Sequence, residues 1–202
     1  MTFVDGKPLN QIAGTVEKNP ERWNGSKGEC LDDMVKGSFF YDEKESKLYA
    51  WLEDDETPDK HMVETYSGEY RGILIGRKLG NITVKDVKLV YCGVAVHGNY
   101  AVVENVEQSW APFVGCHVAG KHCLILNSKF DWNGNSGMGG YEGTGTRIVD
   151  CQTNHNNWRM WSGGWHAGGV KFIASDSWVL QGHKSAYNNG DGIWFDIGRA
   201  HP

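Results

Sequence analysis

The C-terminal third of the chain concentrates the side chains that could do chemistry. A strand-like run ends in the carboxylate Asp196, and Trp194 stands two residues before it. Residues 158–172 supply further candidates: Arg159, Trp161, Trp165, His166 and Lys171. This mixture suits a carbohydrate, because the C–H faces of sugar rings pack on aromatic rings and their hydroxyl groups bind charged partners. Seven of the nine tryptophans lie between residues 110 and 194, which agrees with that interpretation.

Hydrolysis of a glycosidic bond needs two carboxyl groups, one that donates a proton and one that acts as nucleophile or base. Asp196 is the best candidate for the nucleophile or base. Glu142 and Asp191 are the candidates for the second carboxyl group. We expect Lys171 and His166 to assist Asp196 in catalysis. The residues expected to contact the substrate are Trp161, Trp165, Trp194, Arg159, His117 and Glu142.

The same residues also have structural interpretations. Asp196 could cap a turn, and any single tryptophan could fill the core or the flank of the fold. His97 and His117 could be merely solvated or packed, and Lys171 could be a solvated lysine on a strand. The functional hypothesis therefore depends on whether the fold brings these side chains together.

A degenerate internal repeat would position them. Four segments align, and each carries Asp or Asn at its third position: Val84–Tyr91, Val103–Trp110, Ile125–Trp132 and Ile148–His155. The aligned residues are 86, 105, 127 and 150, so successive spacings are 19, 22 and 23 residues. Gly182 continues the series after a longer interval of 32 residues, which contains the candidate-rich segment 158–172.

A period near 22 residues with short apolar strands predicts an all-β protein, a right-handed parallel β-helix. Leucine-rich repeats need a regular leucine frame, which is missing here, and helical repeats are longer. The Asp/Asn column fits a turn in the left-handed conformation, which Asn tolerates, and should stack from coil to coil. Residues 1–70 are more charged and predict a small β cap that includes a hairpin over Gly37–Leu52. Residues 71–202 form the coils.

Strand alternation assigns the faces. In the run that ends at Asp196, Ile193 and Phe195 should point into the core, so Trp194 and Asp196 should point outward. The same logic turns His97 and His117 outward. The last strand, residues 193–197, has no following coil in this sequence. An uncovered strand edge is a template for pairing, so we expect self-association or a partner chain at this open coil.

Composition excludes several function classes. The net charge is −5 without a basic block, which disfavours nucleic acid as a ligand. No apolar run is long enough for a transmembrane helix and residues 1–30 lack the apolar core of a signal peptide, so no membrane partner is predicted. The five cysteines form no CxxC pair. They therefore give no sign of a zinc site or of a disulfide framework. No metal or cofactor is expected.

The stretch Gly168-Gly-Val-Lys-Phe172, followed by Asn188-Asn-Gly-Asp-Gly-Ile-Trp-Phe-Asp-Ile197, resembles right-handed parallel β-helix proteins among the bacterial carbohydrate-active enzymes. The Gly37–Leu52 hairpin resembles the segment that precedes their helix. The nearest named relatives are the β-helical β-xylosidase type of glycoside hydrolase. There the aspartate of a W-x-D stretch is the nucleophile, and Asp196 occupies that position. The family's acid/base glutamate lies about one coil beyond it, past the last residue of this sequence.

This resemblance implies a glycoside hydrolase, or part of one, that acts on a plant or microbial polysaccharide or oligosaccharide and is secreted or periplasmic. Two alternatives stay open. A polysaccharide lyase would recruit Arg159, His166 and Lys171 as acid and base, although no acidic cluster for Ca²⁺ is evident and the net charge disfavours a polyanion. A non-catalytic module would hold a glycan on its tryptophan-rich flank.

Overall fold

The computed structural model describes residues 1–13, 28–66 and 71–197. It divides into two compact units, Met1–Gly68 and Glu69–Pro202. The described residues are almost entirely β, with two short 3₁₀ turns, Leu31–Asp33 and Pro58–Lys60. Over the described part of the chain, no helix is long and apolar enough to cross a membrane.

The first unit contains two small three-stranded sheets. In one, β1 (Thr2–Val4) pairs antiparallel with β2 (Lys7–Pro8) and with β6 (Val63–Thr65). In the other, β4 (Ser38–Asp42) pairs with β3 (Asn10–Ile12) and with β5 (Lys47–Trp51). The predicted hairpin is confirmed: β4 and β5 are antiparallel, and the Asp42 carboxylate accepts hydrogen bonds from the backbone of Lys44 and Glu45 in the turn.

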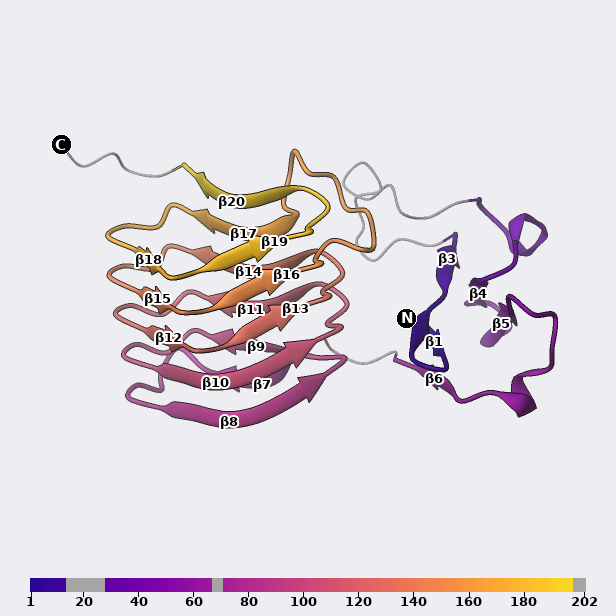
Figure 1. Ribbon diagram of the computed structural model, residues 1–202, viewed down its shortest axis with the longest axis horizontal. Coiled ribbons are helices and arrows are strands. Elements are labelled where there is room, and N and C mark those ends of the chain that lie inside the picture. The colour runs from indigo at the N-terminus through magenta and orange to yellow at the C-terminus, as the bar shows by residue number, and fades with distance from the viewer. Residues whose placement is uncertain (14–27, 67–70, 198–202) are drawn as a thin grey trace. The chain divides into compact units, whose positions relative to one another are not determined.

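The second unit is a right-handed parallel β-solenoid of about 6 turns (Figure 1). One wall is a six-stranded parallel sheet: β7 (Arg71–Ile75), β9 (Gly93–Val96), β11 (Val114–Val118), β14 (Ser136–Tyr141), β17 (Gly168–Ile173) and β20 (Asp191–Asp196). The other is an eight-stranded parallel sheet: β8 (Thr83–Val90), β10 (Val102–Ser109), β12 (Leu124–Leu126), β13 (Lys129–Asp131), β15 (Arg147–Val149), β16 (Gln152–Asn154), β18 (Val179–Gln181) and β19 (Lys184–Ala186). The chain alternates between the walls and rises by one strand per coil.

Apolar columns between the walls form the core. Val94, Cys116, Met138 and Val170 stand in register on four successive strands and are at most 2% exposed. Stacking removes each of these side chains from water along the whole column, which is the main source of stability in such a fold.

The predicted Asp/Asn column is confirmed. Asp86, Asn105, Asn127 and Asp150 have φ values of 56°, 50°, 45° and 51°, and Gly182 continues the column at 63°. Asp86 and Asn105 are adjacent, and the Asn105 amide donates a 2.8 Å hydrogen bond to the Asp86 carboxylate. The column marks a bend in the eight-stranded sheet, where the continuous β10 gives way to the separate strands β12 and β13.

A second polar column lies inside the solenoid, at the turn from one wall to the other. Its members are Gln108, Asn133, Asn156 and Asn188. The Gln108 amide donates to Asn133 at 2.8 Å, and the next two steps of the ladder are each 3.0 Å. Glycines begin the facing strands because the ladder leaves no room: a Cβ on Gly115 would lie 2.3 Å from the Gln108 Oε1 atom. Sequence alternation did not predict this ladder.

The ladder should be a major determinant of stability. Asn156 is 1% exposed, its amide donates to Asn188 and to the Phe130 carbonyl, and its Oδ1 accepts from the backbone and side chain of Asn133. Asn156→Ala leaves several of these groups buried without partners, so we expect a loss of about 3 kcal/mol in the free energy of unfolding. Urea unfolding followed by circular dichroism measures it. Asn99→Ala is the control, since the exposed Asn99 accepts one bond from the Lys121 backbone, and should lose about 1 kcal/mol or less. Equal losses would contradict the ladder's role.

Candidate functional site

Lys171 is the centre of a polar cluster on the outer face of the six-stranded sheet. It lies in β17 between the core residues Val170 and Phe172, and it is only 3% exposed. Its ammonium group is 2.9 Å from an Asp196 carboxylate oxygen and 3.4 Å from the centroid of a ring of Trp194. It also donates a hydrogen bond to the Trp165 carbonyl. The charge of this buried lysine is therefore balanced by a carboxylate, a carbonyl and an aromatic face.

Strand register produces this arrangement. Lys171 pairs with Trp194 and Ile173 pairs with Asp196 across β17 and β20. The Asp196 side chain is 32% exposed, whereas that of Lys171 is 4% exposed, so the carboxylate is the part of the pair that opens to solvent.

Ile193 and Phe195, predicted to face the core, stand in register with the core residues Val170 and Phe172. Phe195 contacts Phe172 with ring centroids 5.7 Å apart. Ile193 and Phe195 are nevertheless exposed, at 47% and 57%, because β20 is the last strand of the sheet and has a partner on one side only.

The long interval of the repeat forms a loop between β16 and β17 that packs against the coil below. Arg159, 7% exposed, donates to the Pro112 carbonyl at 3.2 Å, and Trp161, 2% exposed, packs edge-on against Phe113. Neither side chain faces solvent, so both hold the loop in place. Burial lowers the pKa of Arg159 to about 10. Trp165, from the same loop, is half-buried beside Phe113.

His166 brings the loop onto the sheet. Its Nδ1 is 2.5 Å from the Asn135 amide oxygen and 3.1 Å from the Ser136 hydroxyl. It lies over Gly139, where a Cβ would be 3.4 Å from its Nε2, and Gly139 stands in register between His117 and Lys171. Without a side chain at Gly139, the imidazole occupies the gap in this outer row.

The outer row continues to His117, and the ring of His97, which lies just after β9 and outside the row, is 5.7 Å from the His117 ring in an edge contact. Burial lowers the pKa of both His117 and His166 to about 4. Positive charge adds to the effect, from Arg71 at His117 and from Lys171 at His166, and each histidine also has a histidine neighbour. The row is therefore uncharged near neutral pH, and Lys171 and Asp196 carry the local charge.

The two candidates for a second carboxyl group lie at different distances from Asp196. Asp191 is five residues away on the same extended strand, about 16 Å along it. Glu142 is exposed in the turn after β14, and it follows Tyr141, which pairs with Ile173 in the next strand. Since Ile173 pairs with Asp196, Glu142 is about two strand spacings, roughly 10 Å, from Asp196. A hydrogen bond to Glu142 raises the pKa of Tyr141.

A stack of aromatic rings directly after β10, β13, β16 and β19 was missed from the sequence. Trp110, Trp132, His155 and Tyr187 follow one another with centroid distances of 5.1, 4.2 and 5.0 Å. All four residues have positive φ, from 55° to 62°. Three of the aligned repeats end in these residues, so the signal was present in the alignment. The stacking contact between Trp110 and Trp132 accounts for part of the high tryptophan content.

Compared with known proteins, the chain matches no family model, no curated protein and no solved structure. In the described ranges, no group of three or more His, Cys, Asp or Glu side chains is placed to hold a metal ion. The function is therefore argued from the cluster around Lys171.

Acid should weaken the solenoid through its half-buried histidines. His166 and His183 each have a folded-state pKa of about 4, lowered chiefly by burial from an ordinary value of 6.5. Between these values the unfolded chain binds protons that the folded chain excludes, so stability falls as pH decreases from 6.5 toward 4. Each histidine should contribute a slope of up to about 1.4 kcal/mol per pH unit.

Urea unfolding at pH 7, 6 and 5 measures this slope in the wild type, in His166→Gln and in His183→Gln. Each variant should flatten the dependence by one histidine, and the double variant should flatten it by two. A slope that neither substitution changes would show that other groups determine the acid sensitivity.

Proposed function

We propose that the outer face of the six-stranded sheet binds a saccharide, and that the protein is a glycoside hydrolase, or part of one, in which Asp196 acts as nucleophile or base. The observation that carries this proposal is the ion pair of buried Lys171 with solvent-facing Asp196, formed on the face of Trp194. The resemblance of residues 168–197 to β-helical glycoside hydrolases supports the same assignment.

The energetics of the pair favour a functional role. Burying an ammonium group is costly, and a buried ion pair seldom stabilises a protein more than apolar residues of similar size would. Here the lysine is sealed and the carboxylate is open, so one anionic oxygen is held at a defined position facing solvent. Trp194 and the half-buried Trp165 provide apolar surface next to it, as a sugar ring requires.

In the proposed reaction, Asp196 attacks the anomeric carbon directly or activates a water molecule. Lys171 holds the carboxylate in place through their ion pair. Asp191 is too distant for the second role, because even inverting enzymes keep their carboxyl groups within about 9.5 Å. Glu142 is near that limit. It would therefore serve as proton donor in an inverting mechanism, unless another chain supplies the donor.

The lyase alternative has less support. A lyase would use Lys171 as the base that removes a proton from the uronate ring. An ammonium group has no lone pair, so Lys171 would have to lose a proton as well as its contacts with a carboxylate, a carbonyl and an indole before it could act as a base. A non-catalytic glycan-binding protein would use the same surface. Only a measurement of turnover distinguishes such a protein from a hydrolase.

Asp196→Asn should abolish turnover while saccharide binding survives. Removing a nucleophile or base typically lowers the rate by several orders of magnitude, so we expect a loss of at least about 10³-fold. Release of reducing ends from a panel of neutral and acidic oligosaccharides measures turnover. Asp191→Asn, an exposed carboxylate on the same strand, should retain activity. Equal activity of the wild type and Asp196→Asn would overturn the catalytic assignment, and a greater loss in Lys171→Ala on uronates alone would favour a lyase.

Trp194→Ala should weaken saccharide binding. Loss of the aromatic platform should cost about 1.4 kcal/mol of binding free energy, which corresponds to a roughly tenfold higher Kd. Titration calorimetry with the best oligosaccharide of the panel measures it. Trp132→Ala, in the aromatic stack that follows the strands of the eight-stranded sheet, is the matched control and should bind like the wild type. If both variants bind equally well, the site lies elsewhere.

A further inference from the structure

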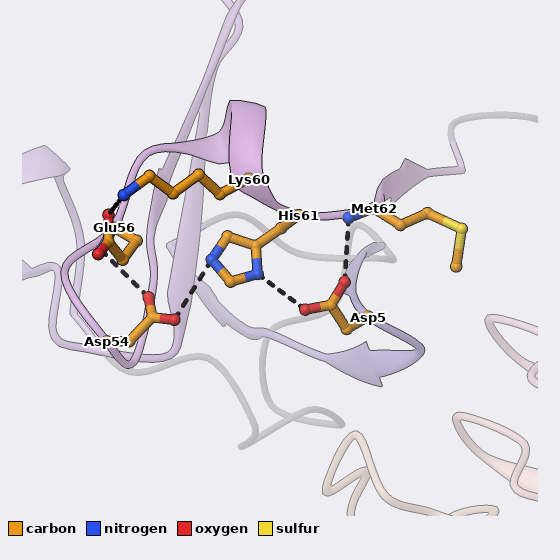
Figure 2. A network of polar contacts seen from close by, with 6 residues as sticks. All are labelled: Asp5, Asp54, Glu56, Lys60, His61 and Met62. Atoms are coloured by element: carbon orange, nitrogen blue, oxygen red, sulfur yellow. Dashed lines mark hydrogen bonds and ion pairs between the residues drawn. The ribbon is translucent and has the colours of Figure 1, made fainter.

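The first unit contains a histidine held between two carboxylates from distant segments. The Nδ1 atom of His61 is 2.7 Å from an Asp5 oxygen, and its Nε2 atom is 3.3 Å from an Asp54 oxygen. Figure 2 shows the imidazole between the two carboxylates, with one nitrogen directed at each. Asp5 belongs to the turn between β1 and β2, whereas Asp54 follows β5.

Backbone contacts extend this junction. The Met62 N–H donates to the Asp5 carboxylate at 3.0 Å, and the Asp5 N–H donates to the Met62 carbonyl at 2.9 Å. On the other side, the Asp54 carboxylate accepts from the Glu56 backbone at 3.1 Å. His61 therefore joins the N-terminal hairpin to the loop that leads into β6.

The charges around His61 are mainly negative. Asp5, Asp54 and Glu56 all favour its protonated form, and Glu56 itself pairs with Lys60. His61 lines a cavity with a volume of about 280 Å³. Asp5, Asp54, Lys7 and Glu53 line the same cavity. The junction thus forms part of the lining of a cavity that Leu9 and Leu52 also line.

The protonation state of His61 determines how many of these contacts are favourable. An imidazolium ion donates from both nitrogens and can bind Asp5 and Asp54 together. A neutral imidazole donates from one nitrogen only and turns a lone pair toward the other carboxylate. Loss of the proton therefore converts one attractive contact into a repulsive one.

We propose that His61 is a pH-operated clamp, which in its charged form fastens the β1–β2 turn to the loop after β5 along the lining of this cavity. The hydrogen bond to Asp5 is the largest influence that raises the pKa of His61 above 6.5, and the same bond lowers the pKa of Asp5 below 3.8. The clamp is complete where Asp5 is ionised and His61 is charged, from about pH 4 to 6.5. It weakens as pH rises through the folded-state pKa of His61.

Histidine NMR on the full chain tests the clamp, with His61→Gln used to assign the resonance. We expect the His61 midpoint to lie above 6.5 and to fall by at least half a pH unit in Asp5→Asn. Asp54→Asn should lower it less. Asp59→Asn removes an exposed carboxylate from the 3₁₀ turn next to His61, and it should leave the midpoint unchanged.

Hydrogen exchange of the Met62 amide gives an independent measure. After correction for the intrinsic rate, its exchange should be at least fivefold slower at pH 6 than at pH 8.5, and this difference should vanish in His61→Gln. A wild-type midpoint at or below 6.5, or Met62 protection that is independent of pH, would overturn the proposal. Both measurements on the wild type decide the matter even if Asp5→Asn fails to fold.

Discussion

Each residue of a solenoid coil lies one strand spacing, about 4.8 Å, from the residue at the same position of the next coil. This constraint selects residue types that interact favourably with their own kind. Apolar side chains do so by excluding water, which gives the column Val94, Cys116, Met138 and Val170. Carboxamides do so because each both donates and accepts, which gives the interior asparagine ladder. Aromatic rings do so by stacking. Like charges stacked on successive strands would instead repel one another. The candidate site lies where one column changes from one residue type to another.

The outer row of the six-stranded sheet shows this change. Along one column the chain places Ala95, His117, Gly139, Lys171 and Trp194. The glycine admits His166 from the loop, and the next strand introduces a lysine, which cannot stack on another lysine. Its charge is instead balanced by Asp196, two residues beyond Trp194, and by the Trp165 carbonyl of the same loop. The longer interval in the repeat thus supplies Lys171, which interrupts the column, and Trp165, whose carbonyl accepts a hydrogen bond from it.

Much of the fold could be predicted because periodicity is a local property of the sequence. The recurrence of Asp or Asn at residues 86, 105, 127 and 150 identified the coil, and the left-handed preference of Asn identified its turn. Strand alternation also separated Trp194 and Asp196 from their neighbours Ile193 and Phe195. These neighbours align with core residues of β17. Alternation fails at turns, however, which is why the buried Asn133 and Asn156 were missed. The burial of Arg159 and Trp161 depends on how an irregular loop packs, and no local pattern encodes it. The saccharide and the location of the protein stay predictions.

The position of the site at the end of the stack has a thermodynamic consequence. Trp194 and Asp196 lie on β20, which is paired on one side only in the described structure and leaves Ile193 and Phe195 largely exposed. Such an edge strand belongs to the less stable part of a fold, because opening it breaks one set of backbone hydrogen bonds rather than two. A saccharide that contacts both Trp165, from the loop before β17, and Asp196 would bridge that loop and β20 and would stabilise the pairing of β17 with β20. Any strand that covers the free edge of β20 would stabilise the same pairing. Each would therefore increase the affinity of the protein for the other, if both bind only when β20 is in place.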